Sequence, residues 1–138
     1  MIVLDTNVLS ELMRAEPAPA VVRWLAAQPP LELCTTAVSV AEIRYGIARL
    51  PRSKRRSQLA EDADEVFSAF ADQVLPFDAA AAADYADIVV TRAKAGSPIS
   101  GFDAQIAAIC RSNGAALATR NTADFADLDL ALVDPFAS

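Results

Sequence analysis

The sequence predicts an α/β fold, a three-layer α/β/α sandwich around a short and mainly parallel sheet. Short apolar segments alternate along the chain with longer segments of helical periodicity. The first apolar segment, Met1 to Leu4, is typical of a strand buried on both faces of a parallel sheet. No internal repeat or low-complexity linker separates these segments, so we expect a single domain over residues 1–138.

The N-terminal half is expected to begin with the strand 1–4. Asp5, Thr6 and Asn7 follow it and provide capping residues for a helix that contains Val8, Leu9 and Leu12. Proline pairs and runs of helical or alternating periodicity bound the other elements of this half. These elements are a helix over 21–26, a strand over 31–36, a helix over 39–50 and a long amphipathic helix over 54–73.

The C-terminal half is expected to place a brief extended segment at 74–77 before an alanine-rich helix. Asp78 caps that helix, which runs to Lys94 and is closed by Gly96 and Pro98. Ser100 opens the next helix and Gly114 ends it. Two short strands follow, over 115–119 and 131–135. Helices therefore dominate, as expected around a small sheet.

Composition excludes several kinds of chemistry. The chain has no histidine, which rules out Ser-His-Asp triads and histidine-bound zinc. Its two cysteines, Cys34 and Cys110, form no CxxC motif and lie among apolar residues. We expect both thiols to be buried and reduced in a cytoplasmic protein, because no secretion signal or bilayer-length apolar run is found. The net charge of −6 argues against non-specific coating of nucleic acid.

Asp5 stands where a buried strand ends. It has a simple interpretation as a helix cap, but Thr6 and Asn7 are equally able to cap. A carboxylate at the end of a buried strand is costly unless it is paired or bound to a cation. Ligands of open parallel sheets bind beyond the carboxyl ends of the strands, so we favour a functional role for Asp5.

Three further acids stand at comparable places, each with a structural alternative. Ser39 and Glu42 match a capping box, although Gly46, four residues after Glu42, leaves space beside it. Asp103 lies three residues after Ser100, yet it shares a helix stripe with Ile106, Ala107 and Cys110. Asp124 lies in a loop, where it either caps a turn or, in competition with Asn121, serves the site.

Carboxylates that share one cleft cannot all ionise without a cation. A site built only from oxygen ligands suits Mg²⁺, with Mn²⁺ as the alternative. Such ions hold phosphates and activate water for attack on phosphodiesters.

The ordered set of motifs resembles the PIN-domain family. The motifs are LDTN at Asp5, AE at Glu42, the acid of GFDAQIAA at Asp103, and a late TRN…DF segment. Together they span nearly the whole chain, and the greatest resemblance is to VapC-type toxins of bacterial toxin–antitoxin pairs, including the FitB-like branch. Each motif is weak by itself, whereas the order and spacing of the set are specific.

The resemblance implies a Mg²⁺- or Mn²⁺-dependent endoribonuclease, the toxin of a type II pair, with a PIN-like fold. It assigns the metal to Asp5, Glu42 and Asp103, and water activated by the metal would attack the RNA phosphorus. Many family members have an Asp directly after TR, where this chain has Asn121, so either Asp124 or Asn121 supplies the fourth ligand. Thr6, Asn7 and Thr119 are expected to support the site. The family pattern also implies a homodimer and a cognate antitoxin, with assembly on operator DNA and an antitoxin Arg presented to the acids.

Basic residues gather between two expected helices, in the segment RLPRSKRR. This segment is either a solvated turn or a surface that contacts RNA phosphates. The candidates for RNA contact are Arg49, Arg52, Lys54, Arg55, Arg56 and Arg120.

Three other functions compete with the nuclease. A phosphatase with an Asp nucleophile usually needs a second Asp two residues later, where this chain has Asn7. A non-catalytic PIN-fold partner of a DNA-binding antitoxin is disfavoured by the joint presence of Asp5, Glu42 and Asp103. The third alternative is a binding protein in which the acids are only helix caps.

Overall fold

Five parallel strands form the centre of the molecule. A computed structural model describes residues 1–137; Ser138, the last residue of the predicted domain, lies outside the described residues. The strands follow the sheet order β3-β2-β1-β4-β5, so the N-terminal strand is central. They are β1 (Ile2–Leu4), β2 (Leu33–Thr36), β3 (Val74–Leu75), β4 (Ala116–Ala118) and β5 (Leu132–Val133).

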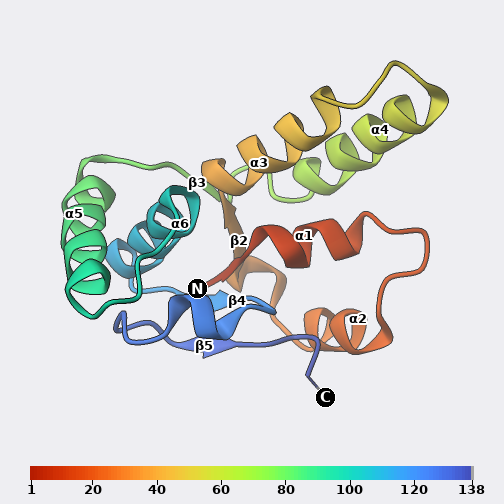
Figure 1. The fold of residues 1–138 in the computed structure, drawn as a ribbon. Coiled ribbons are helices and arrows are strands. Elements are labelled where there is room, and N and C mark those ends of the chain that lie inside the picture. Colours follow the sequence, from red (N-terminus) through yellow and green to blue (C-terminus); the bar gives the residue numbers. More distant parts are fainter. Residues whose placement is uncertain (138) are drawn as a thin grey trace.

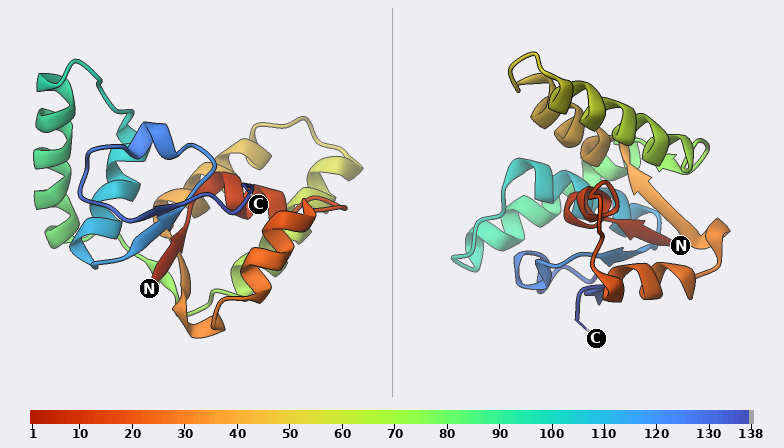
Figure 2. Two further views of the ribbon diagram at one scale, coloured as in Figure 1. Left: turned by 90° about the horizontal axis from the view of Figure 1, so that it is seen from below. Right: turned by 90° about the vertical axis from the view of Figure 1, so that its right-hand side faces the viewer.

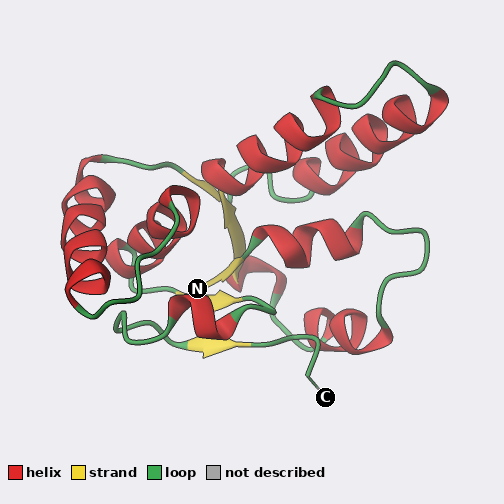
Figure 3. Ribbon diagram, viewed as in Figure 1, coloured by secondary structure: helices red, strands yellow, loops and turns green. Residues whose placement is uncertain are grey.

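Helices cover both faces of this sheet (Figures 1 and 3). One pair, α5 and α6, lies apart from the others, while α3 and α4 lie side by side as an antiparallel hairpin (Figures 1 and 2). The helices are α1 (Thr6–Leu12), α2 (Pro19–Ala26), α3 (Ala37–Ala48), α4 (Lys54–Ser68), α5 (Ala79–Lys94) and α6 (Gly101–Ser112), with 3₁₀ turns at η1 (Pro30–Glu32) and η2 (Thr122–Phe125).

Two hydrophobic cores, one on each face, hold the three layers together. Val3 and Leu117 point into the core under α5 and α6, with Ile88, Ile106 and other buried residues of those helices. Leu4 and Ala118, the next residues along, point into the core under the remaining helices. This alternation is the two-residue period of a strand buried on both faces, and it confirms the predicted α/β/α sandwich.

The helix predicted over 39–50 begins earlier, at Ala37, and ends at Ala48. Its cap is Thr36, the last residue of β2, whose extended backbone leaves the hydroxyl free to accept from the Ser39 amide at 3.0 Å. Ser39 is consequently a buried residue inside the helix. The capping-box interpretation of Ser39 and Glu42 is therefore wrong.

The long helix predicted over 54–73 is also shorter, because α4 ends at Ser68. Phe70 turns into the core, and the Gln73 side chain donates to the Leu33 carbonyl at 2.6 Å, which fixes the chain for entry into β3. The strands are all shorter than predicted: a 3₁₀ turn that starts at Pro30 precedes β2, and β1, β3, β4 and β5 also lack one or more of their predicted residues. No helix among residues 1–137 is long and apolar enough to span a lipid bilayer.

Candidate active site

Asp5 lies at the carboxyl end of the central strand and is only 4% exposed. It is the N-cap of α1, because its Oδ1 accepts from the Thr6 amide at 2.8 Å. Its Oδ2 accepts from the Thr119 hydroxyl at 2.7 Å and from Asn7 Nδ2 at 3.4 Å. Asp5 therefore caps a helix and also presents a buried carboxylate at the sheet edge. The cap interpretation is therefore confirmed, and the functional role of Asp5 stays a prediction.

Thr119 links Asp5 to the end of the neighbouring strand. It follows β4, and its fully buried hydroxyl also accepts from Asn7 Nδ2 at 3.2 Å and from the Asn121 amide at 3.1 Å. The Asn7 side-chain oxygen in turn accepts from the Arg120 amide at 3.2 Å. These hydrogen bonds join the ends of β1 and β4, and they fix the orientation of the Asp5 carboxylate.

Glu42 reaches the same region from α3. Its Oε1 accepts from the Thr6 hydroxyl at 2.9 Å, and that hydroxyl also lies 3.1 Å from Ser39 Oγ. Glu42 makes no capping-box contact, and its carboxylate instead accepts from Thr6, a residue of the LDTN motif. Thr6 therefore connects Glu42 to the residue next to Asp5.

Asp103 and Asp124 together line a small cavity. Asp103 is in the first turn of α6, which Ser100 caps by accepting from the Asp103 amide at 3.2 Å. Asp124 is part of the 3₁₀ turn η2, a regular element where a loop was expected. The cavity measures about 200 Å³, and its lining residues are Arg92, Pro98, Ile99, Ser100, Asp103 and Asp124.

The acids influence one another electrostatically. Burial raises the pKa of Asp5, and the charges of Asp103 and Asp124 raise it further against the hydrogen bonds of Thr119 and Thr6. Burial also raises the pKa of Glu42, with added contributions from Asp5 and Asp103. Burial and the charge of Asp124 raise the pKa of Asp103. The four acids from four segments therefore act on a common region at the sheet edge.

The donor set of this region fits a hard divalent cation. It offers carboxylate, hydroxyl and amide oxygens, and the two cysteines are buried in apolar surroundings. Within residues 1–137, no three acidic or thiol side chains come close enough together to enclose a metal ion. Mg²⁺ does not require such an enclosure, because it keeps several waters and usually binds through one or two carboxylates.

The other predicted site residues are more dispersed. Asn121 is exposed and lies beside the acids through its backbone bond to Thr119. Arg120 is exposed, with its guanidinium carbon 3.7 Å from the centre of the Phe136 ring. The basic segment forms the turn between α3 and α4 and the first turn of α4, at the end of the hairpin away from the sheet (Figure 1). The structure therefore separates most of the basic candidates from the acids.

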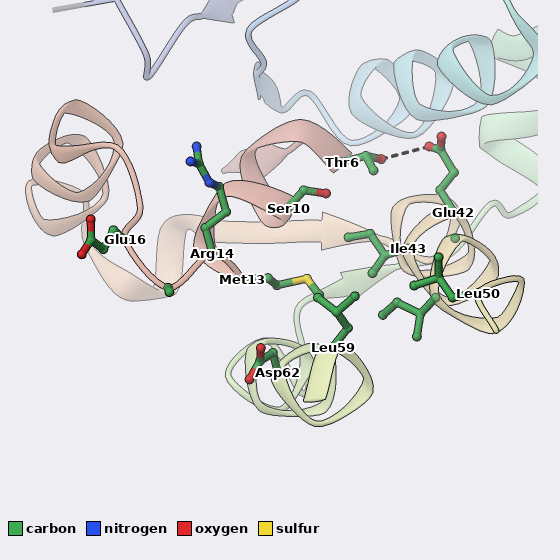
Figure 4. A pocket seen from close by; sticks show the side chains of 13 residues that line it. Thr6, Ser10, Met13, Arg14, Glu16, Glu42, Ile43, Leu50, Leu59 and Asp62 are labelled. Carbon is green, nitrogen blue, oxygen red and sulfur yellow. Dashed lines mark hydrogen bonds between the residues drawn. The ribbon is translucent and has the colours of Figure 1, made fainter. Parts of the chain in front are cut away.

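A larger groove begins at Glu42 and runs between α1, α3 and α4 (Figure 4). Its volume is about 810 Å³. Apolar side chains of Met13, Ile43, Leu50 and Leu59 point into it, while Arg14, Glu16, Glu42 and Asp62 lie along its edges. Gly46 also lines the groove, and a Cβ added there would meet no atom within 4 Å. The gap inferred beside Glu42 is thus part of an extended apolar surface whose margin carries three acids and Arg14.

Two residues of the site escaped the sequence analysis. Ser39 was interpreted only as a cap, although its hydroxyl lies beside that of Thr6. Arg92 was not noticed, because a basic residue near the end of a helix is ordinarily explained by the helix dipole. Only the fold brings Arg92 to the cavity of Asp103 and Asp124.

We expect Asp103→Asn to leave the metal-free protein as stable as the wild type, or more stable, at pH 7.5. Because the folded-state pKa of Asp103 is raised, the folded state binds more protons than the unfolded state just above the ordinary carboxyl pKa. Stability from this group therefore falls as pH rises through that window, and removing the charge recovers it. The gain should be at most about 1 kcal/mol, since Asp103 is partly exposed.

Urea unfolding in EDTA at pH 4 and pH 7.5 measures this effect. The difference from wild type should shrink at the lower pH, where Asp103 becomes protonated. Asp72→Asn, at an exposed position after α4, is the control for loss of a negative charge. A clear loss of stability in Asp103→Asn alone would mean that the carboxylate has a structural partner instead.

Comparison with known proteins identifies relatives of this chain and supports its fold. A family model described as PIN domain matches residues 2–130. The chain is 42% identical over 137 residues to VapC ribonuclease Y4jK of Sinorhizobium fredii, covering 99% of this chain and 98% of that protein. It is 37% identical to Toxin FitB of Neisseria gonorrhoeae, covering 99% of both. The solved structure of FitAB bound to an IR36 DNA fragment superposes with a TM-score of 0.92, at 37% identity, over 100% of this chain and 97% of that one.

Proposed function

The chain belongs to the PIN domain family, and we propose that it is a metal-dependent endoribonuclease, the toxin of a toxin–antitoxin pair. One observation carries the proposal. Asp5, Glu42 and Asp103 stand on three segments near one sheet edge, where burial, and then the charges of neighbouring acids, raise the pKa of each. Such an arrangement is unfavourable for stability alone and is useful for holding a cation.

Asp5, Glu42 and Asp103 would hold Mg²⁺ or Mn²⁺, and Asp124 is the better candidate for the fourth acid. Asp124 lines the same cavity as Asp103, and its charge acts on both Asp103 and Asp5. Asn121 contributes its backbone amide to Thr119. When bound, the ion would make water a stronger nucleophile at neutral pH and stabilise charge on the leaving oxygen.

The chain's other groups prepare this site. Thr119 and the Thr6 amide hold both oxygens of Asp5, so its carboxylate has one orientation. The Thr6 hydroxyl does the same for one oxygen of Glu42. Such outer contacts typically change metal affinity by about 10- to 100-fold. Arg120 and the basic turn between α3 and α4 are proposed to contact the RNA backbone, because they add positive charge to an otherwise acidic protein.

We also propose that a cognate antitoxin docks in the groove between α1, α3 and α4. The groove exposes apolar side chains beside acids, which suits an amphipathic segment with basic residues. The groove begins at Glu42, so a basic side chain of the antitoxin would also reach the acids. A homodimer, and assembly with the antitoxin on operator DNA, remain predictions that accompany this function.

The test is cleavage of an RNA pool that contains transfer, ribosomal and messenger RNA by the antitoxin-free protein. Cleavage is expected with Mg²⁺ or Mn²⁺ and should stop with EDTA. Calorimetric titration of Mn²⁺ into the same sample reports binding independently. A folded protein that neither binds Mn²⁺ nor cleaves RNA would overturn the proposal in favour of the non-catalytic partner protein.

A further inference from the structure

Arg92 connects two segments that carry acids of the site. It lies in the last turns of α5 and is partly buried. Its Nε donates to the Ser97 carbonyl at 2.7 Å, and its Nη1 donates to the Asp124 carbonyl at 2.8 Å. Both distances are those of good hydrogen bonds from a charged donor. One guanidinium therefore bonds to two backbone segments that are distant in sequence.

Each of these carbonyls belongs to a connection that positions an acid. Ser97 precedes Ser100, which caps α6 and thereby places Asp103 in the first turn. Asp124 lies in η2, between Thr119 at the end of β4 and the strand β5. Arg92, Asp103 and Asp124 all line the same 200 Å³ cavity. The guanidinium therefore joins the backbone on one side of the cavity to the backbone on the other side.

The segment after η2 has an irregular backbone, so its attachment to the rest of the fold depends on specific contacts. Phe125 and Leu128 anchor it in the core, but Asp127 and Asp129 both adopt positive φ values, 63° and 56°. Non-glycine residues in this left-handed region are held there by their surroundings. The buried side chains fix the segment to the fold, whereas the Arg92 bond acts directly on the residue that carries the acid.

We propose that Arg92 is a positioning residue that sets the spacing of Asp103 and Asp124 by clamping the α5–α6 connection to the η2 segment. This inference rests on the proposed function in one respect, the use of both acids for a cation. The planar guanidinium presents its donors at fixed angles, so it serves two carbonyls at once, which the single ammonium of Lys does less well. Arg92 acts through backbone geometry, by its hydrogen bonds to the Ser97 and Asp124 carbonyls.

A clamp and a simple charge predict opposite results. Arg92 is a cation near carboxylates, and its charge lowers the pKa of Asp103 against the other influences. If only charge mattered, removing it would strengthen cation binding by making the cavity more negative. If the clamp matters, removing it loosens the spacing of the acids and weakens cation binding. The sign of the change therefore separates the two roles.

The experiment compares Arg92→Gln, Arg92→Lys and Lys94→Gln in the full chain. Lys94→Gln removes the same charge from the exposed end of the same helix and serves as the matched control. Mn²⁺ affinity is measured by calorimetry, and hydrogen exchange is followed at the Asp124 and Ala126 amides, which bond within η2. Thermal unfolding of each variant checks that the fold is intact.

Both Arg92 variants should bind Mn²⁺ about tenfold more weakly than wild type, with Lys94→Gln unchanged. The η2 amides should exchange about tenfold faster in Arg92→Gln even without metal. Tighter Mn²⁺ binding by Arg92→Gln, with Arg92→Lys binding like the wild type, would overturn the clamp in favour of a charge effect. Unchanged exchange at η2 would also overturn it. If the wild type binds no Mn²⁺, the proposed function fails, and exchange alone still decides whether Arg92 clamps the segment.

Discussion

Asp5→Asn is expected to reduce RNA cleavage by more than about a hundredfold, which exceeds what losing a mere orienting contact to a ligand costs. Asn has the shape of Asp but no negative charge, and its side chain offers one oxygen instead of two. The oxygen at the Oδ1 position can still accept from the Thr6 amide. An amide nitrogen takes the place of Oδ2. It faces the Thr119 hydroxyl, which already accepts two N–H groups and has no place for a third. The variant therefore loses both the charge and the orientation of the carboxylate.

The fold should tolerate this change. Burial raises the pKa of Asp5, so its ionised form is disfavoured in the folded state and Asn removes that cost. Cleavage assays and Mn²⁺ calorimetry on the same preparation, beside a thermal unfolding curve, measure the effect. A folded Asp5→Asn protein that still cleaves RNA and is inhibited by EDTA would show that Asp5 is a cap and no metal ligand.

Glu11→Gln is the matched control, because Glu11 is the other buried carboxylate in the part of the chain that the structure describes. Glu11 accepts from the Ala18 amide at 2.8 Å and pairs with Arg14 at 3.2 Å. The Ala18 hydrogen bond and Arg14 lower its pKa, so its ionised form contributes stability above the ordinary carboxyl pKa. Glu11→Gln should thus lose stability and keep cleavage, the reverse of Asp5→Asn.

The sequence predicted the architecture and the region of the site for local reasons. Residues 1–4 are all apolar, a run that is typical of a strand buried on both faces of a parallel sheet. The carboxyl ends of parallel strands share an edge, which is why Asp5 and Thr119 could be placed together before any contact was known. The motif order of the family then assigned the metal to Glu42 and Asp103 as well as to Asp5.

Other features depend on contacts that sequence does not reveal. Whether Thr36 or Ser39 caps α3 depends on where β2 stops, and pairing with β1 and β3 decides that. α4 ends early because Phe70 and Gln73 find partners elsewhere in the fold. Arg92 donates a hydrogen bond to a carbonyl 32 residues away, and no local sequence pattern predicts such a bond. These are all cases in which tertiary packing overrides propensity.

Gly46→Trp is expected to weaken binding of the cognate antitoxin by at least about thirtyfold, the cost of losing one strong contact at an interface centre. Gly46 lies near the end of α3 on the wall of the apolar groove, and nothing stands within 4 Å of the position of a new Cβ. An indole there would extend into the space that an amphipathic segment needs.

Two companion variants make this result specific. Gly46→Ala adds only a methyl group and should stabilise α3 by up to about 1 kcal/mol while binding the antitoxin nearly normally. Ala41→Trp places the same large ring on an exposed part of α3 outside the groove and should bind like the wild type. Calorimetry or gel filtration of toxin mixed with antitoxin measures the three proteins. If Gly46→Trp binds like Ala41→Trp, the antitoxin docks on another surface, and the groove has a different occupant.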